Sequence, residues 1–125
     1  MIELTNMILI RKDDKYLFLN RRRSTCPGIT FPGGHVEENE SIVDSVIREA
    51  YEETGLKISN PKLVDIIEWN TNTHRELSFL YETDEFEGDL KPSFEGEVFF
   101  ARLDEINKEN YSNDFDKILK KYKLI

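Results

Sequence analysis

The order of its elements predicts that this chain is an α/β protein, with a mixed β-sheet held between helices. Apolar runs typical of strands come first, a helical stripe follows, further strand-like runs come next, and a second helical stripe ends the chain. Such an order favours a sheet with helices on its faces. A length of 125 residues is enough for one domain with its own core, so we expect residues 1–125 to form one domain.

The first strands are predicted to form a hairpin. Residues 5–10 and 16–20 are apolar, strand-like runs, and the polar residues 12–15 between them are typical of a turn. We expect a loop over residues 21–30.

A central helix is predicted over residues 41–54, and Gly55 supplies its C-terminal stop. Its apolar stripe consists of Ile42, Val43, Val46, Ile47 and Ala50. At 3.6 residues per turn, Glu49, Glu52 and Glu53 fall within an arc of about 100° beside that stripe. These carboxylates repel one another and oppose the helix dipole. Such a cluster is either a solvated acidic face or the oxygen ligands of a divalent cation, for which Mg²⁺ or Mn²⁺ is the natural choice.

The second half of the chain predicts three more strands and a final helix. Residues 62–69 and 76–82 read as strands joined by a polar segment, and residues 97–103 read as a further strand. An acidic connection over residues 84–96 precedes that last strand. Residues 114–123 carry apolar side chains at helical spacing and predict the C-terminal helix.

Seven residues in and around the central helix stand at a spacing that few other sequences share: Gly34, Glu40, Arg48, Glu49, Glu52, Glu53 and Gly55. This spacing is the signature of the Nudix box, with Ala50 as the only soft departure, and the chain resembles the Nudix hydrolases. The resemblance covers the box closely and the rest of the chain more loosely. It implies an α/β/α sandwich and a pyrophosphohydrolase that uses water as nucleophile and Mg²⁺ as electrophile.

The resemblance also implies roles for single residues. The metal ligands would be the backbone carbonyl of Gly33 and the side chains of Glu49, Glu52 and Glu53, and Glu49 is also the implied base. Arg48 could be a surface partner of Glu52 one turn on, or it could hold a catalytic carboxylate in its ionised form. The resemblance favours the second role.

Three residues outside the box resemble positions of the MutT-type nucleoside triphosphate hydrolases. Arg22 matches a phosphate-contacting arginine, although residues 21–23 could equally be a solvated basic run. Glu95 resembles a glutamate brought to the metal from a later loop, with Glu97 as its competitor. Asn113 matches a position that reads a purine, or it caps the final helix.

These three residues together predict hydrolysis of nucleoside triphosphates to a nucleoside monophosphate and pyrophosphate, with oxidised purine nucleotides such as 8-oxo-dGTP among the candidates. One alternative within the same chemistry is a Nudix hydrolase of nucleotide sugars or dinucleoside polyphosphates. Another class is a nucleotide-binding or metal-binding module without turnover, and the intact box argues against it.

Composition narrows the partners to small molecules. A net charge of −8 argues against binding of a nucleic acid polymer, which requires a basic surface. Cys26 is the only cysteine, so an intrachain disulfide is excluded and a reducing compartment is the simpler setting. The N-terminal residues have no basic leader, and no apolar run approaches membrane-spanning length. A cytoplasmic protein that makes no membrane contact is expected, and the sequence sets no oligomeric state.

Overall fold

The computed structural model describes residues 1–22 and 25–125, and its secondary structure comprises a mixed sheet, a small second sheet and two α-helices. The strands are β1 (Ile2–Lys12), β2 (Lys15–Arg21), β3 (Gly28–Thr30), β4 (Gly33–His35), β5 (Lys57–Ser59), β6 (Lys62–Asn70), β7 (Arg75–Thr83), β8 (Glu85–Glu87) and β9 (Gly96–Ala101). The helices are α1 (Ile42–Thr54), α2 (Phe115–Lys121) and two short 3₁₀ turns, η1 (Leu103–Glu105) and η2 (Lys108–Asn110).

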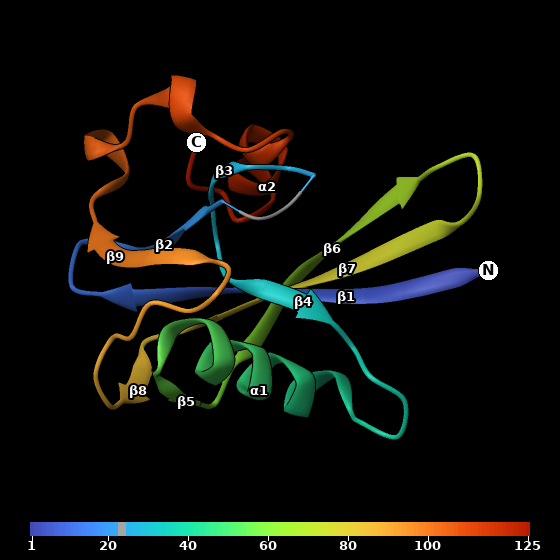
Figure 1. The fold of residues 1–125 in the computed structure, drawn as a ribbon, viewed down its shortest axis with the longest axis horizontal. Coiled ribbons are helices and arrows are strands. Elements are labelled where there is room, and N and C mark those ends of the chain that lie inside the picture. The colour runs from blue at the N-terminus through green and yellow to red at the C-terminus, as the bar shows by residue number, and fades with distance from the viewer. Residues whose placement is uncertain (23–24) are drawn as a thin grey trace.

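Strand β1 is the centre of the large sheet, whose order is β3-β2-β1-β7-β6 (Figure 1). It pairs in parallel with β7 along nearly its whole length, and the other pairs of the sheet are antiparallel. Strand β2 pairs with β1 only beside the turn, at Arg11 and Lys12. In the N-terminal half of β1, residues Thr5, Asn6 and Met7 pair with strand β4 instead. The sheet is therefore mixed, as predicted, and β4 carries its glycines to the middle of β1.

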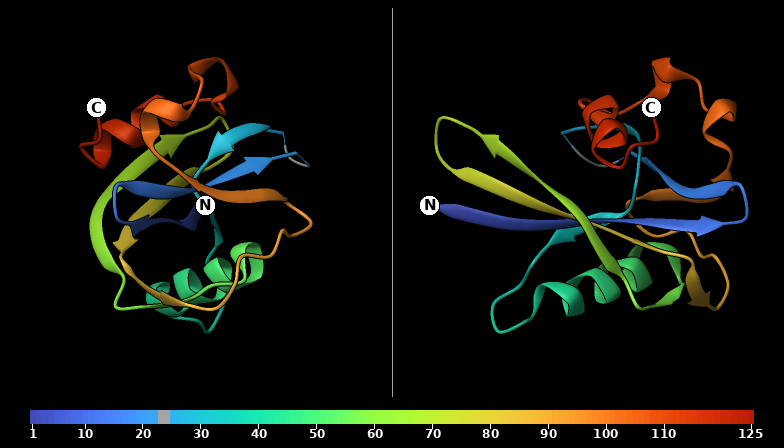
Figure 2. Two further views of the ribbon diagram at one scale, coloured as in Figure 1. Left: turned by 90° about the vertical axis from the view of Figure 1, so that its left-hand side faces the viewer. Right: turned by 180° about the vertical axis from the view of Figure 1, so that it is seen from behind.

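The helices cover opposite faces of the sheet, and each face has its own apolar core (Figures 1 and 2). Alternate residues of β1 supply both cores, because successive side chains of a strand point to opposite faces. Met7 and Leu9 pack in the core that includes α2, whereas Ile8 and Ile10 pack in the core that includes α1. The predicted sandwich of helix, sheet and helix is confirmed.

Most of the predicted long elements are present. The hairpin turn lies at Asp13, which adopts a φ of 57°, and Asp14. Helix α1 begins after Ser41, whose Oγ accepts a 3.0 Å hydrogen bond from the amide of Asp44, and ends at Gly55 with a φ of 82°. The C-terminal end agrees with the prediction from the sequence, and the N-terminal end differs by one residue because Ser41 is the cap.

The structure corrects two of the predicted connections and the end of one predicted strand. Residues 28–30 of the expected loop form β3, paired with β2, while residues 23–24 of that loop lie outside the described residues. Residues 85–87 of the expected acidic connection form β8, which pairs with β5. Strand β9 ends at Ala101, not at residue 103, because η1 begins there.

In the described part of the chain, no helix combines the length and the apolar character that crossing a membrane requires.

Candidate active site

A cavity of about 590 Å³ lies where β1, β4, β7 and α1 meet. Gly33 and Gly34 of β4 lie against it, and Glu49 reaches it from α1. Glu95 reaches it from the loop before β9, and Arg21 from the end of β2. The fold thus brings together charged side chains that are far apart in the sequence.

Glu49 lies directly against the backbone of Gly34. A methyl group added to Gly34 would lie 2.5 Å from Oε1 and 2.7 Å from Oε2 of Glu49, closer than real contacts allow. The absence of a side chain at Gly34 therefore gives the Glu49 carboxylate its place beside β4. Burial raises the pKa of Glu49, and the negative charges of Glu52 and Glu95 raise it further, while Arg48 acts in the opposite direction.

Glu53 is the most deeply buried carboxylate of the site, with 4% of its surface exposed. Its Oε1 accepts a 2.8 Å hydrogen bond from the backbone amide of Gly33. Burial raises the pKa of Glu53 to about 8, and the charges of Glu49 and Glu95 contribute to the increase. The Gly33 amide and the charge of Arg21 lower the pKa without cancelling that effect.

Arg48 is the hub of a hydrogen-bond network on α1. Its guanidinium donates to both carboxylate oxygens of Glu40, at 2.7 and 3.0 Å, and to the carbonyl oxygen of His35 at 3.0 Å. The same group donates to Glu49 at 3.0 Å and to Glu52 at 2.8 Å. The hydrogen bond from Arg48 lowers the pKa of Glu40. Glu40 thus fixes the arginine, and the arginine contacts two of the predicted metal ligands.

Glu52 is the most exposed of the three glutamates of α1. Its side chain is 49% exposed and faces Arg48, and Glu52 is not among the described residues that line the cavity. Arg48 therefore makes the contacts that both of its predicted roles require. It pairs with Glu52 one turn on, as a surface partner would, and it also pairs with Glu49, as a residue that holds a catalytic carboxylate would.

The two candidates for a remote glutamate occupy different places. Glu95 lines the cavity, and its backbone is held by the Ser93 hydroxyl at 3.1 Å and by the amide of Arg22 at 3.0 Å. Glu97 is exposed and forms an ion pair with the side chain of Arg22. Only Glu95 therefore lies beside the box glutamates.

Arg21, not Arg22, lines the cavity in the described structure. Its Nε is buried and has no hydrogen-bond partner among the described residues. Alternation along β2 agrees with this arrangement once the faces of the strand are known, because Arg21 has the same parity as Leu17, which packs in the core that includes α1. Arg22 has the parity of Phe18, which packs in the core that includes α2.

Asn113 lies away from the glutamates, in a second cavity of about 360 Å³ that Tyr111 and Asp114 also line. The N-cap of α2 is Asp114, in a left-handed conformation with a φ of 66°. Within the described structure, no side chain caps this helix. Asn113 therefore precedes the N-cap residue of α2 and does not cap the helix, which was its alternative predicted role.

The donor set at the cavity fits a hard divalent cation. It consists of the carboxylate oxygens of Glu49 and Glu95, which line the cavity with Gly33, and of Glu53, which accepts the hydrogen bond from the Gly33 amide. Mg²⁺ and Mn²⁺ prefer oxygen ligands. The pKa values of Glu49 and Glu53 are raised by burial and by the charges of neighbouring carboxylates, so a cation would relieve that repulsion. These residues fit such an ion chemically and stay predicted ligands, and Glu52, at 49% exposure, is the most exposed of the predicted ligands on α1.

Comparison with known proteins identifies relatives along nearly the whole chain. The family profile described as NUDIX domain matches residues 4–122. The "ADP-ribose pyrophosphatase" of Methanocaldococcus jannaschii is 31% identical over 121 residues, which cover 91% of this chain and 69% of that protein. The "Probable DHNTP pyrophosphohydrolase" of Lactococcus lactis is 32% identical over 119 residues, covering 86% of this chain and 69% of the relative.

Solved structures share the fold. A MutT NUDIX hydrolase from Burkholderia pseudomallei superimposes with a TM-score of 0.84 at 19% identity, covering 97% of this chain and 98% of that one. The mutator MutT protein of Bacillus halodurans has a TM-score of 0.81 at 29% identity, covering 98% of this chain and 82% of that one.

Proposed function

The chain belongs to the Nudix family of hydrolases, which act on pyrophosphate bonds, and from that premise we propose that it hydrolyses nucleoside triphosphates to a monophosphate and pyrophosphate. The observation that carries the proposal is the position of Glu49, against Gly34 in a cavity that Glu95 and Arg21 also line. Carboxylates that hold a cation, a base and a phosphate-binding arginine are the parts that this chemistry needs.

In the proposed reaction, water attacks a phosphorus atom of the triphosphate, and the bond from that phosphorus to the pyrophosphate leaving group breaks. Glu49 accepts the proton of the water. Its raised pKa suits this role, because a general base works best with a pKa near the operating pH. Arg48 holds the Glu49 carboxylate through its 3.0 Å hydrogen bond and so orients the base.

Mg²⁺ or Mn²⁺ would be held by the proposed metal ligands, which are Gly33, Glu49, Glu52, Glu53 and Glu95. Such an ion, when bound, supplies positive charge that neutralises the phosphate oxygens as charge develops on them. Glu53 is held in place for this role by the Gly33 amide.

Arg21 is the proposed contact for a substrate phosphate. Its guanidinium lies at the cavity, whereas the guanidinium of Arg22 pairs with Glu97. A planar guanidinium with several donors suits phosphate oxygens. Asn113 stays a candidate for contact with the nucleobase of the substrate, provided that the nucleotide reaches the second cavity, which Asn113 lines.

Hydrolysis of ADP-ribose is the second candidate function, because the Methanocaldococcus jannaschii relative is named for it at 31% identity. The same ligands and base would serve, since this substrate also contains a pyrophosphate bond. Only the groups on either side of that bond differ.

The test is a turnover screen of the purified protein with Mg²⁺, with products separated by chromatography. The substrates are unmodified and oxidised nucleoside triphosphates, DHNTP, ADP-ribose, nucleotide sugars and dinucleoside polyphosphates. We expect nucleoside monophosphate and pyrophosphate from a nucleoside triphosphate. Turnover of ADP-ribose alone would establish the second candidate, and no turnover of any compound would indicate a binding module.

A matched pair of variants assigns the turnover to the site. Glu49→Gln removes the base and a cation ligand and should lower kcat by at least about 100-fold. Glu87→Gln makes the same chemical change on β8, where the side chain is exposed, and should leave kcat unchanged. Equal rates for the two variants would refute the role of Glu49.

A further inference from the structure

Both histidines of the chain meet at one carboxylate near the start of β1. The chain has only two histidines, His35 and His74. The Nε2 of His35 lies 2.6 Å from Oε1 of Glu3, and the Nε2 of His74 lies 2.7 Å from Oε2 of the same residue. Two imidazoles from separate segments therefore converge on Glu3.

A second carboxylate completes the cluster. Glu76 of β7 is the register partner of Glu3 in the parallel pairing of β7 with β1, so the two side chains lie on the same face of the sheet. One ligand atom from each of Glu3, His74 and Glu76 lies within 4.8 Å of the other two, and all three residues are half-buried.

From this juxtaposition we propose that Glu3, His74 and Glu76 form a binding site for a transition-metal ion of the Zn²⁺ class, separate from the Nudix box. Imidazole nitrogen together with carboxylate oxygen suits Zn²⁺, Ni²⁺ or Co²⁺, whereas Mg²⁺ prefers oxygen ligands alone. Three protein ligands leave one coordination position of a tetrahedral ion open, which His35 or a small anion can fill.

The turn before β7 holds His74 in a suitable orientation. The Nδ1 of His74 lies 3.0 Å from Oγ1 of Thr73 and 3.3 Å from Oγ1 of Thr71. With Nδ1 occupied in this way, Nε2 is directed at Glu3. A hydrogen bond to the ring nitrogen that does not bind the ion fixes the orientation of a metal-binding histidine.

Glu76 is held as well, but it keeps one oxygen for a ligand. The Oγ1 of Thr5 donates to Oε2 of Glu76 at 3.1 Å, and Thr5 in turn contacts the Ser78 hydroxyl at 2.7 Å. Ligands that lie about 2.0 to 2.2 Å from Zn²⁺ are about 3 to 3.5 Å apart. The ligand atoms now lie within 4.8 Å of one another. Rotation about side-chain bonds that moves each of these atoms by about 1 Å would bring them to the spacing that an ion requires.

The proposed ion would lie at the wall of the cavity that holds Glu49. His35 and Glu76 line that cavity together with Glu49 and Glu95. The ligands of the proposed site are nevertheless different from the box glutamates. Zn²⁺ binding at this site can therefore be measured without any measurement of hydrolysis. The proposed site stands whether or not nucleoside triphosphates are the substrates.

The first test is titration of the 125-residue chain with Zn²⁺ in the presence of millimolar Mg²⁺, monitored by calorimetry and by the imidazole nitrogen signals in NMR. Because the chain has only two histidines, His35→Gln and His74→Gln assign both sets of signals. We expect saturable binding of one Zn²⁺ and a shift of the His74 ring signals. No saturable binding, or binding that leaves the His74 signals in place, would overturn the proposal.

Variants then test single ligands of the proposed Zn²⁺ site. His74→Gln and Glu3→Gln should each weaken Zn²⁺ binding at least about tenfold, because each removes a ligand. Glu87→Gln, an equal change on the exposed strand β8, should leave the affinity unchanged. Glu53→Gln separates the two metal sites, since it alters the box and should leave Zn²⁺ binding as it is. Loss of Zn²⁺ binding in Glu53→Gln together with unchanged binding in His74→Gln would place the ion in the box instead.

Discussion

Gly33 and Gly34 are adjacent in the chain, yet a side chain would meet different obstacles at each. At Gly33 an added methyl group would overlap the carbonyl oxygen of Asn6 and would lie 2.9 Å from the Cα of Met7. Both are backbone atoms of the neighbouring strand β1 and cannot move aside without breaking the pairing. At Gly34 the obstacle is the carboxylate of Glu49, the mobile end of a long side chain.

Gly34→Ala should therefore abolish most of the activity while the fold persists. The new methyl group displaces the Glu49 carboxylate, and misplacement of a catalytic group by about 1 Å costs on the order of 100-fold in rate. We expect kcat/KM to fall by about that factor, with the free energy of unfolding changed by less than about 1 kcal/mol. Steady-state kinetics and denaturant unfolding of the same preparation provide both numbers.

Gly33→Ala is the matched comparison. It should lower the free energy of unfolding by several kcal/mol, about 3 or more, because overpacking against backbone forces strands apart. If Gly33→Ala were as stable as the wild type, or if Gly34→Ala kept full activity, the assignment of these two glycines would be wrong.

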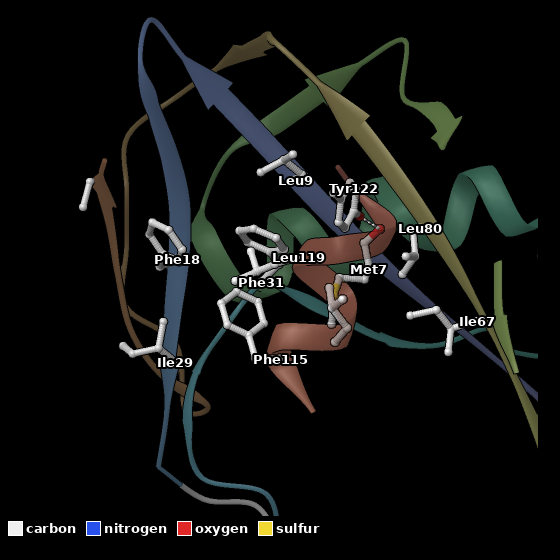
Figure 3. Packing of buried hydrophobic residues seen from close by; sticks show 12 residues of the cluster. Met7, Leu9, Phe18, Ile29, Phe31, Ile67, Leu80, Phe115, Leu119 and Tyr122 are labelled. Atoms are coloured by element: carbon white, nitrogen blue, oxygen red, sulfur yellow. Dashed lines mark hydrogen bonds between the residues drawn. The ribbon is translucent and has the colours of Figure 1, made fainter. Parts of the chain in front are cut away.

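At the scale of elements, Tyr122 ties the end of α2 to the sheet. Its hydroxyl donates to the carbonyl oxygen of Tyr81 on β7 at 2.7 Å and lies 3.4 Å from that of Met7 on β1. The ring packs edge-on against Phe31, at a centroid distance of 5.5 Å, in the core shown in Figure 3. A short helix of seven residues depends on such contacts, because helices of this length are not stable alone.

Tyr122→Phe should lower the free energy of unfolding by about 1 kcal/mol, since it removes a buried hydrogen bond and leaves a carbonyl without its donor. Tyr51→Phe is the matched control, because that side chain is 60% exposed on α1, and no measurable change is expected there. Denaturant titration of the three proteins makes the comparison. A Tyr122 variant as stable as the wild type would show that packing alone holds α2.

The sequence predicted the elements that carry a long periodic pattern, and missed those that depend on a distant partner. Helix α1 and the long strands follow from periodicity within their own residues. Strands β3, β4, β5 and β8 are three residues long each, too short for a pattern, and exist because another strand lies beside them.

The same distinction applies to the site. The spacing along α1 placed Glu49 and Glu53 on one side of a helix, because local geometry alone decides that. The choice between Arg21 and Arg22 depends on which face of β2 meets α1, a tertiary fact that resemblance to a motif does not contain. Convergence of both histidines on Glu3 likewise arises from long-range pairing, of β1 with β4 for His35 and of β1 with β7 for His74.

At the scale of the whole molecule, stability is coupled to the charge of the site. The protein has a net charge of −8 and gathers carboxylates around a buried one, Glu53, with its pKa raised to about 8. An ordinary glutamate in the unfolded chain has a pKa of about 4.5. Between these two values the folded protein holds a proton that the unfolded chain releases.

The metal-free protein should therefore lose stability as the pH rises from about 4.5 to about 8. The unfolded state binds fewer protons in this window, so the free energy of unfolding falls by up to about 1.4 kcal/mol per pH unit from this group. Glu40, with its lowered pKa, acts with the opposite sign and only below that window. Denaturant unfolding in the presence of a chelator, across this pH range, should show a decrease of about 2 to 4 kcal/mol.

Glu53→Gln isolates the cause, because its amide stays neutral at every pH. The variant should show a flatter dependence and should be more stable than the wild type at about pH 8 without metal. Mg²⁺ should stabilise the wild type at that pH far more than the variant, since a ligand that binds only the folded state adds to its stability. Stability of the metal-free wild type that rises with pH through this window would show that Glu53 is ionised in the fold, and would remove the electrostatic argument for a cation beside it.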